Sequence, residues 1–255
     1  PRFLKDATDR NRTSPFAFTG NKFEFRMPGS AASISSANIA INTAVAEELR
    51  QFADELEAAQ DFKSALQGLI KRVVREHKRI IFNGNGYSEE WQEEAARRGL
   101  ANHRTTAEAL PCFVDPKSIE LFCQMGVMSE TEVRSRYEVK LEKYNKLMNI
   151  ETRVMKRMAY RDYLPAISEY MRDLAETITS VKAAIASSDM EEHEKLLSYL
   201  VKGTNAVAAC TRTLIVEHDS AEAIEDLQEQ AYAYAEKVIP AMDALRVEID
   251  ALECV

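Results

Sequence analysis

Apolar residues recur at helical spacing from residue 33 almost to the end of the chain, and this periodicity constrains the fold more than any other feature. It predicts helices over residues 33–58 and 61–80, shorter elements between 81 and 128, and long helices from 129 to 252. Short polar breaks separate the long helices. This pattern is typical of an antiparallel bundle, although the apolar faces could equally contact a neighbouring subunit.

Local sequence signals predict where these helices begin and end. We expect helices to start at capping residues: Ser35 or Ser36, Thr105–Glu108, Asp115–Pro116, Ser129–Glu132 and Asp219–Ser220. We expect Pro165 to kink or restart the helix near Leu164, and we expect breaks at Ser187–Asp189 and Gly203. The helix after residue 129 carries a core-type apolar stripe that continues on a neighbouring line: Val133, Tyr137, Leu141, Tyr144 and Met148, then Ile150, Val154 and Met158.

Before the helices, residues 22–27 alternate between charged and apolar side chains. The charged residues are Lys22, Glu24 and Arg26, and the apolar ones are Phe23, Phe25 and Met27. Because successive side chains of a strand point to opposite faces, the pattern predicts a strand with its charged residues on one face. Thr19–Asn21 suits a turn, so we expect an antiparallel hairpin with Phe16–Phe18.

The charged face of this hairpin has the groups that metal–phosphate sites use. A carboxylate oxygen is a hard ligand suited to Mg²⁺ or Mn²⁺. A guanidinium two residues along the same face can hold a phosphate or carboxylate through two hydrogen bonds. From alternation alone, the solvated side of an antiparallel sheet is the more common explanation. The functional interpretation therefore depends on a longer match.

Such a match exists, because the sequence around the hairpin resembles the C-terminal part of the glutamine synthetase catalytic domain, and the type III branch in particular. The similar segments are Arg10–Ser14, Glu24–Pro28, Phe82–Ser88, Ala109–Pro111, Phe113–Lys117 and Tyr137–Asn145. The resemblance spans most of the chain, but only residues 9–30 carry active-site motifs.

The resemblance implies an enzyme in which ATP phosphorylates the side-chain carboxylate of L-glutamate and ammonia then displaces phosphate from γ-glutamyl phosphate. By motif position it implies that Glu24 ligates one of the Mg²⁺ or Mn²⁺ ions. Arg26 would contact the transferring phosphate and the glutamate side chain, and Arg12 would reach the nucleotide phosphates. Metal ions and fixed positive groups are what phosphoryl transfer requires. A further Arg that other branches place after the first motif has no counterpart in Pro15–Phe18.

We therefore predict a mainly α fold, with a short antiparallel β-hairpin from the end of a glutamine synthetase catalytic domain followed by a long-helix bundle. Residues 1–60 are assigned to the catalytic-domain end and residues 61–255 to a helical C-terminal region. We expect the other metal ligands and the substrate pockets to lie upstream of Pro1, so that this piece alone is inactive. The alternatives are a non-enzymatic helical interaction or scaffold domain, or a related glutamate–amine ligase.

Composition and charge set the expected partners and location. A net charge of -8 and a pI near 5.3 argue against nucleic acid or an anionic membrane as a partner. No apolar run approaches the roughly 18 residues that span a bilayer, and no signal-peptide pattern is present, so a cytoplasmic location is predicted. The family resemblance implies identical subunits in a large ring-shaped homo-oligomer. The basic residues between 71 and 79 are interpreted as a solvated helix face.

The cysteines and histidines are scattered, without the spacing of a metal site. We predict reduced thiols at Cys112, Cys123, Cys210 and Cys254. We predict surface positions without catalytic or metal-binding roles for His77, His103, His193 and His218.

Overall fold

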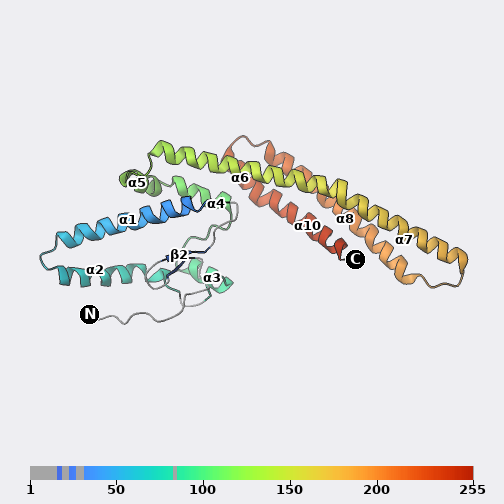
Figure 1. The fold of residues 1–255 in the computed structure, drawn as a ribbon, viewed down its shortest axis with the longest axis horizontal. Helices are drawn as coiled ribbons and strands as arrows, with labels where there is room; N and C mark the ends of the chain where they lie inside the picture. Colours follow the sequence, from blue (N-terminus) through green and yellow to red (C-terminus); the bar gives the residue numbers. More distant parts are fainter. Residues whose placement is uncertain (1–15, 19–22, 27–31, 83–84, 255) are drawn as a thin grey trace. The chain divides into compact units, whose positions relative to one another are not determined.

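The computed structural model describes residues 16–18, 23–26, 32–82 and 85–254. The chain divides into two compact units. Unit 1 comprises residues 1–104 and 115–133, and unit 2 comprises residues 105–114 and 134–255. Helices dominate the described residues of both units (Figure 1). Within the described ranges, no helix has the length and apolar character needed to cross a membrane.

The β component of the predicted fold class needs correction. Strands β1 (Phe16–Phe18) and β2 (Phe23–Phe25) pair antiparallel over three residues each. A two-stranded ribbon of this length is not stable by itself in water and forms no β layer. The described chain is an α-helical structure, and the helix bundle is the part of the predicted fold class that agrees with it. The turn predicted at Thr19–Asn21 lies outside the described residues.

Unit 1 contains an antiparallel pair of helices, α1 (Ser35–Glu57) and α2 (Phe62–His77) (Figure 1). The guanidinium of Arg72 on α2 donates two hydrogen bonds to the carboxylate of Glu55 on α1, at 3.0 and 2.6 Å. The serine cap predicted for α1 does not form, because the residue at the cap position is Ile34 and makes no side-chain hydrogen bond there.

Shorter elements complete unit 1. They are η1 (Lys78–Ile80), α3 (Glu89–Arg97) and α5 (Pro116–Gln124). The start predicted for α5 is confirmed, because Asp115 accepts a hydrogen bond from the backbone N–H of Lys117 at 2.9 Å and proline follows it in the first turn.

Unit 2 is a bundle of long helices. Its elements are α4 (Thr106–Ala109), η2 (Leu110–Val114), α6 (Glu130–Met158, from Arg134 onward), η3 (Ala159–Tyr163), α7 (Leu164–Ala184), α8 (Glu191–Glu222), α9 (Leu227–Ala233), η4 (Tyr234–Val238) and α10 (Ile239–Glu253). Helix α8 packs against both α7 and α10. The core between them is fully buried at Val207 and Leu214 of α8, Val238 of η4 and Leu245 of α10. The capping box at Thr105–Glu108 is confirmed.

At Pro165 a π-helical turn, η3, joins α6 to α7, and α7 begins at Leu164, where a restart was one of the two predicted outcomes. The same arrangement recurs where η4 precedes Pro240. In both cases the π turn occupies the positions from six to two residues before the proline. Proline cannot donate a backbone hydrogen bond to the preceding turn, and a wider π turn at that point lets the helix continue.

Two predicted helix boundaries in unit 2 are wrong. Helix α8 continues through Gly203, and it also continues through Asp219–Ser220 to Glu222. A Cβ atom added at Gly203 would lie 2.5 Å from Cδ2 of Leu252 on α10. Gly203 thus allows α8 and α10 to pack closely. Sequence spacing alone does not distinguish such a glycine from one that ends a helix. The last three elements, α9, η4 and α10, begin instead at Leu227, and Asp226 caps α9.

The apolar stripe of α6 is only partly placed as predicted. Its first part is in the core, since Val133 is fully buried and Leu141 is 2% exposed. Its predicted continuation is wrong, since Ile150 is 58% exposed. The buried line runs instead through Thr152 and Ala159, both fully buried.

Candidate functional site

Glu24 and Arg26 lie at the end of β2, where the two-residue repeat of a strand places them on the same face. The Nε and Nη2 atoms of Arg26 both donate to Oε2 of Glu24, each at 3.2 Å. The side chain of Arg26 is 17% exposed and that of Glu24 is 26% exposed. The structure therefore brings these two predicted site residues together in a partly buried ion pair.

The pair has the chemistry expected of a metal–phosphate site, but it is not a complete site. A carboxylate is a suitable ligand for Mg²⁺ or Mn²⁺, which bind several oxygen atoms. Among the described residues, three potential metal ligands in unit 2 have donor atoms within 4.8 Å of one another. Glu24 does not belong to that group. The carboxylate of Glu24 has the chemistry of one ligand of such an ion. Arg12 and Lys22 lie outside the described residues, so their positions relative to this pair stay predictions.

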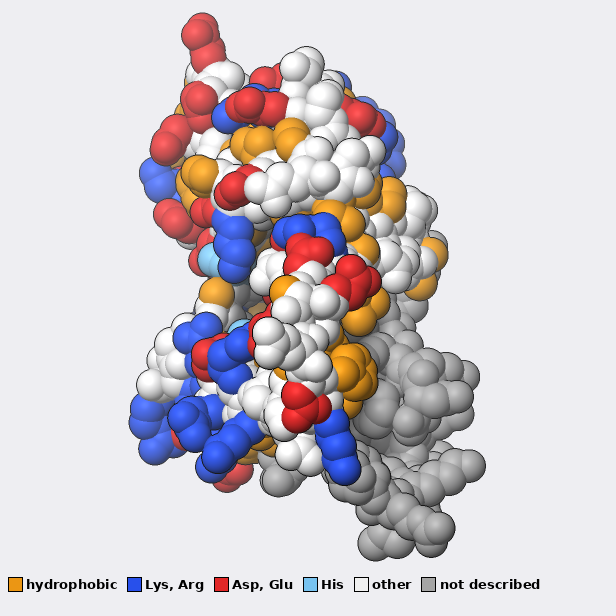
Figure 2. All heavy atoms as spheres, turned by 90° about the vertical axis from the view of Figure 1, so that its left-hand side faces the viewer, with side chains coloured by type: hydrophobic (Ala, Val, Ile, Leu, Met, Phe, Trp, Pro, Cys, Tyr) orange, Lys and Arg blue, Asp and Glu red, His pale blue; other side chains and the backbone are white. Residues whose placement is uncertain are grey.

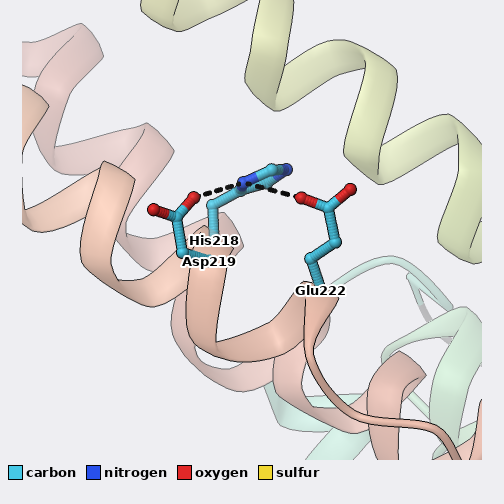
Figure 3. Close-up of side chains that lie close together, drawn as sticks. All are labelled: His218, Asp219 and Glu222. Carbon is cyan, nitrogen blue, oxygen red and sulfur yellow. Dashed lines mark hydrogen bonds and ion pairs between the residues drawn. The ribbon is translucent and has the colours of Figure 1, made fainter.

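A second polar cluster, which the sequence did not predict, lies between α6 and α8 in unit 2. It is centred on His218, whose side chain is 1% exposed, so the predicted surface position of this histidine is wrong. Figure 3 shows His218 with Asp219 and Glu222, all three from α8. His218 Nδ1 lies 3.2 Å from Oδ1 of Asp219 and 3.9 Å from Oε2 of Glu222.

Helix α6 contributes the positive groups of this cluster. Lys156 Nζ lies 3.2 Å from His218 Nδ1 and 3.6 Å from Oδ1 of Asp219. The other carboxylate, Glu222, accepts hydrogen bonds at Oε1 from Asn149 at 2.9 Å and from Arg153 at 2.5 Å. The cluster therefore joins α6 to the C-terminal part of α8 through charge-assisted hydrogen bonds.

These contacts shift the pKa values of the acidic groups. The hydrogen bond with His218, supported by the charge of Lys156, lowers the pKa of Asp219. Hydrogen bonds from Asn149 and Arg153 lower the pKa of Glu222. Burial raises the pKa of the neighbouring Tyr234. Both carboxylates are thus held in their charged forms by the groups around them.

The donor atoms of His218, Asp219 and Glu222 lie within 4.8 Å of one another, so these three residues form a group that could hold a metal ion. Lys156 argues against this role, because its ammonium group lies close to two of the three donor atoms. A divalent cation there would have to displace that ammonium group. We interpret the cluster as a polar connection between two helices, in which His218 is buried and both carboxylates are exposed.

The sequence did contain a signal for the burial of His218. The buried line of α8 repeats at helical spacing through Val207, Thr211, Leu214, His218 and Ala221. His218 occupies one position of that line, but a pattern search that counts histidine as polar does not detect it.

The sequence is similar to known glutamine synthetases. Residues 65–182 match the family described as Glutamine synthetase C-terminal domain. Over 99% of this chain, "Glutamine synthetase" of Bacteroides fragilis (strain YCH46) is 37% identical and "Type-3 glutamine synthetase" of Dictyostelium discoideum is 36% identical. "Glutamine synthetase" of Butyrivibrio fibrisolvens is 34% identical over 98% of the chain. The chain spans 36%, 35% and 36% of the length of these three relatives, respectively.

Proposed function

Because the chain belongs to the glutamine synthetase family, we propose that it forms part of an ATP-dependent ligase that joins ammonia to L-glutamate through γ-glutamyl phosphate. The similarity to named glutamine synthetases along nearly the whole chain is the observation that carries this proposal. It does not favour the scaffold alternative, because these relatives are named as synthetases. The division at residues 60 and 61 between a catalytic-domain end and a helical region stays a prediction.

Within that enzyme, Glu24 and Arg26 are the described residues proposed to act at the site. When bound, Mg²⁺ or Mn²⁺ would neutralise the charge that develops on the phosphates of ATP, and Glu24 would supply one oxygen ligand. Arg26 would hold the transferring phosphate and the glutamate carboxylate with its planar guanidinium group. Arg12 is proposed to contact the nucleotide phosphates.

The ion pair between Glu24 and Arg26 gives these roles a physical basis. Its two hydrogen bonds restrict the rotamers of both side chains before any ligand binds. A guanidinium held in place by a neighbouring carboxylate loses less conformational entropy when it binds an anion.

The cellular setting is also a proposal. L-Glutamate and ammonia are proposed as substrates, and identical subunits of a large ring-shaped homo-oligomer as partners. A cytoplasmic location is proposed. These proposals rest on the family.

The experiment that tests the site uses the longer protein that contains this sequence, with glutamine formation measured over a range of Mg²⁺ concentrations. We expect Glu24→Gln to abolish synthesis at ordinary Mg²⁺, because one charged metal ligand is lost. We expect Arg26→Lys to fail as well, because an ammonium group cannot reproduce a planar, two-point contact. A matched control is Glu253→Gln at the end of α10. Near-normal turnover by either site variant would refute its assigned role.

A further inference from the structure

A polar groove lies between α6 and the segment formed by α9 and η4 in unit 2. Its volume is about 350 Å³, which lies within the range of pockets that bind small molecules, roughly 300–1,000 Å³. Residues of one face of α6 line it together with residues of α9 and η4, and they include Asn145, Lys146, Ile150, Arg153, Leu227 and Tyr234. All of these elements belong to one compact unit.

The buried amide of Asn145 lines this groove with its hydrogen bonds incomplete. The residue is 4% exposed. Its Nδ2 atom donates to the backbone oxygen of Leu227 at 3.0 Å, whereas its buried Oδ1 atom has no hydrogen-bond partner among the described residues. A buried acceptor without a donor destabilises a fold, and most such groups in proteins are paired. The position therefore points to a donor supplied by a bound molecule.

A ligand atom reaches this oxygen only after a side chain in the groove wall shifts, because Oδ1 of Asn145 is nearly closed to solvent. The wall has mobile candidates for that shift. Ile150 is 58% exposed, and the side chain of Lys146 is 72% exposed. Exposed side chains change rotamer within nanoseconds, so the groove can open locally without a movement of its helices.

The charges of the groove favour an anion. Lys146 and Arg153 contribute two positive groups, and Glu142 contributes one negative group. Lys146 Nζ lies 2.7 Å from Oε2 of Glu142, and Nη2 of Arg153 donates to Glu222 at 2.5 Å. Both cations are thus held in place, and each has further N–H donors. These donors suit a carboxylate, which accepts several hydrogen bonds.

Surface charge alone does not distinguish a site in this protein. Figure 2 shows a face of the molecule on which Lys and Arg side chains lie among Asp and Glu side chains. Such mixed charge is usual, because charged residues are mostly exposed. The groove differs because its cations adjoin a buried acceptor without a donor, at Asn145, and an exposed apolar side chain, at Ile150.

We propose that this groove binds a small carboxylate that carries an O–H or N–H donor and an apolar group. The donor would pair with Oδ1 of Asn145, the carboxylate would contact Lys146 or Arg153, and the apolar group would cover Ile150. Binding is non-covalent. The proposal does not depend on the proposed function, because none of these residues belongs to the site that contains Glu24.

Ligand-observed NMR titration of the longer protein tests this proposal with two probes, phenyllactate and phenylpropionate, which differ only in the hydroxyl group of the former. We expect phenyllactate to bind about three to ten times more tightly, because one hydrogen bond to a neutral acceptor supplies a factor of this size. Asn145→Leu removes the acceptor at similar side-chain volume and should abolish the difference between the two probes.

A second variant tests the carboxylate contact and does not alter the buried amide. Lys146→Gln, at an exposed position, should weaken the binding of both probes by a similar factor. Lys143→Gln makes the same change of charge at an exposed position of α6 that does not line the groove. It is the matched control and should leave both affinities unchanged. If Asn145→Leu prevents folding, Lys146→Gln and its control still locate the binding site.

Equal affinities of the two probes for the unmodified protein would overturn the proposal, because Oδ1 of Asn145 would then have no ligand donor. A difference that persists in Asn145→Leu would overturn it as well. So would binding that neither groove variant changes, because the probe would then occupy another site. Absence of phenyllactate binding at millimolar concentrations would also refute it.

Discussion

His218 shows how a single residue can be predictable in position but not in partners. Its place on the buried line of α8 follows from helical spacing. Its contact with Lys156 joins residues 62 positions apart in sequence, and no local pattern indicates it. For Glu24 and Arg26, by contrast, a local pattern was sufficient. The two-residue repeat of a strand predicts that both side chains lie on the same face.

The lowered pKa values of Asp219 and Glu222 predict how the stability of unit 2 depends on pH. A carboxyl group with a depressed folded-state pKa stabilises the fold above its unfolded pKa, which is about 4. That contribution is lost as the pH falls through the lower, folded-state value. The double variant Asp219→Asn/Glu222→Gln should therefore lose less in Tm between pH 6 and pH 3 than the unmodified chain.

Thermal unfolding followed by circular dichroism measures this difference. Asp250→Asn, which removes an exposed carboxylate of α10, is the control and should leave the acid-induced loss in Tm almost unchanged. An equal loss in the double variant and the unmodified chain would show that these two carboxylates do not stabilise the fold.

At the scale of elements, helix content and most helix starts could be predicted from sequence. The capping box at Thr105 and the cap at Asp115 are local signals, and the structure confirms both. The break assigned to Gly203 failed because a glycine chosen for close packing against Leu252 has the same sequence pattern as a glycine that ends a helix.

The contact at Gly203 makes a quantitative prediction. Alanine is favoured over glycine inside a helix by about 1 kcal/mol, but overpacking costs about 1–3 kcal/mol. Gly203→Ala alone should therefore lower the free energy of unfolding or leave it unchanged. In a Leu252→Ala background the clash is gone, and the same substitution should raise that free energy by up to about 1 kcal/mol. Urea unfolding of the four proteins of this cycle measures the coupling, and identical effects of Gly203→Ala in both backgrounds would contradict it.

At the scale of the whole molecule, the two units differ in how much hydrophobic core they contain. Sequence periodicity predicted the helices of both units, but it could not show that the packed clusters gather in unit 2. Packing between helices depends on contacts far apart in sequence, as between α8 and α10. The extent of the active site could not be predicted either, because a single carboxylate and guanidinium do not specify the remaining ligands.

This difference predicts the order in which the 255-residue chain loses structure. Limited proteolysis should cleave within residues 32–82 before it cleaves α7, α8 or α10, because few buried contacts oppose local opening in unit 1. Mass spectrometry of the early fragments identifies the sites. Early cleavage within α8 at the same rate as in α1 and α2 would contradict the prediction.

The central claim, that this chain is part of a glutamine synthetase, is tested most directly with ¹⁵N-labelled ammonia. The longer protein is supplied with ATP, Mg²⁺, L-glutamate and labelled ammonia, and the product is observed by NMR. We predict that the label appears in the side-chain amide of glutamine and that phosphate is released in equal amount. Absence of this labelled amide under conditions in which the protein is folded would contradict the claim, as would amide formation only when a primary amine replaces ammonia.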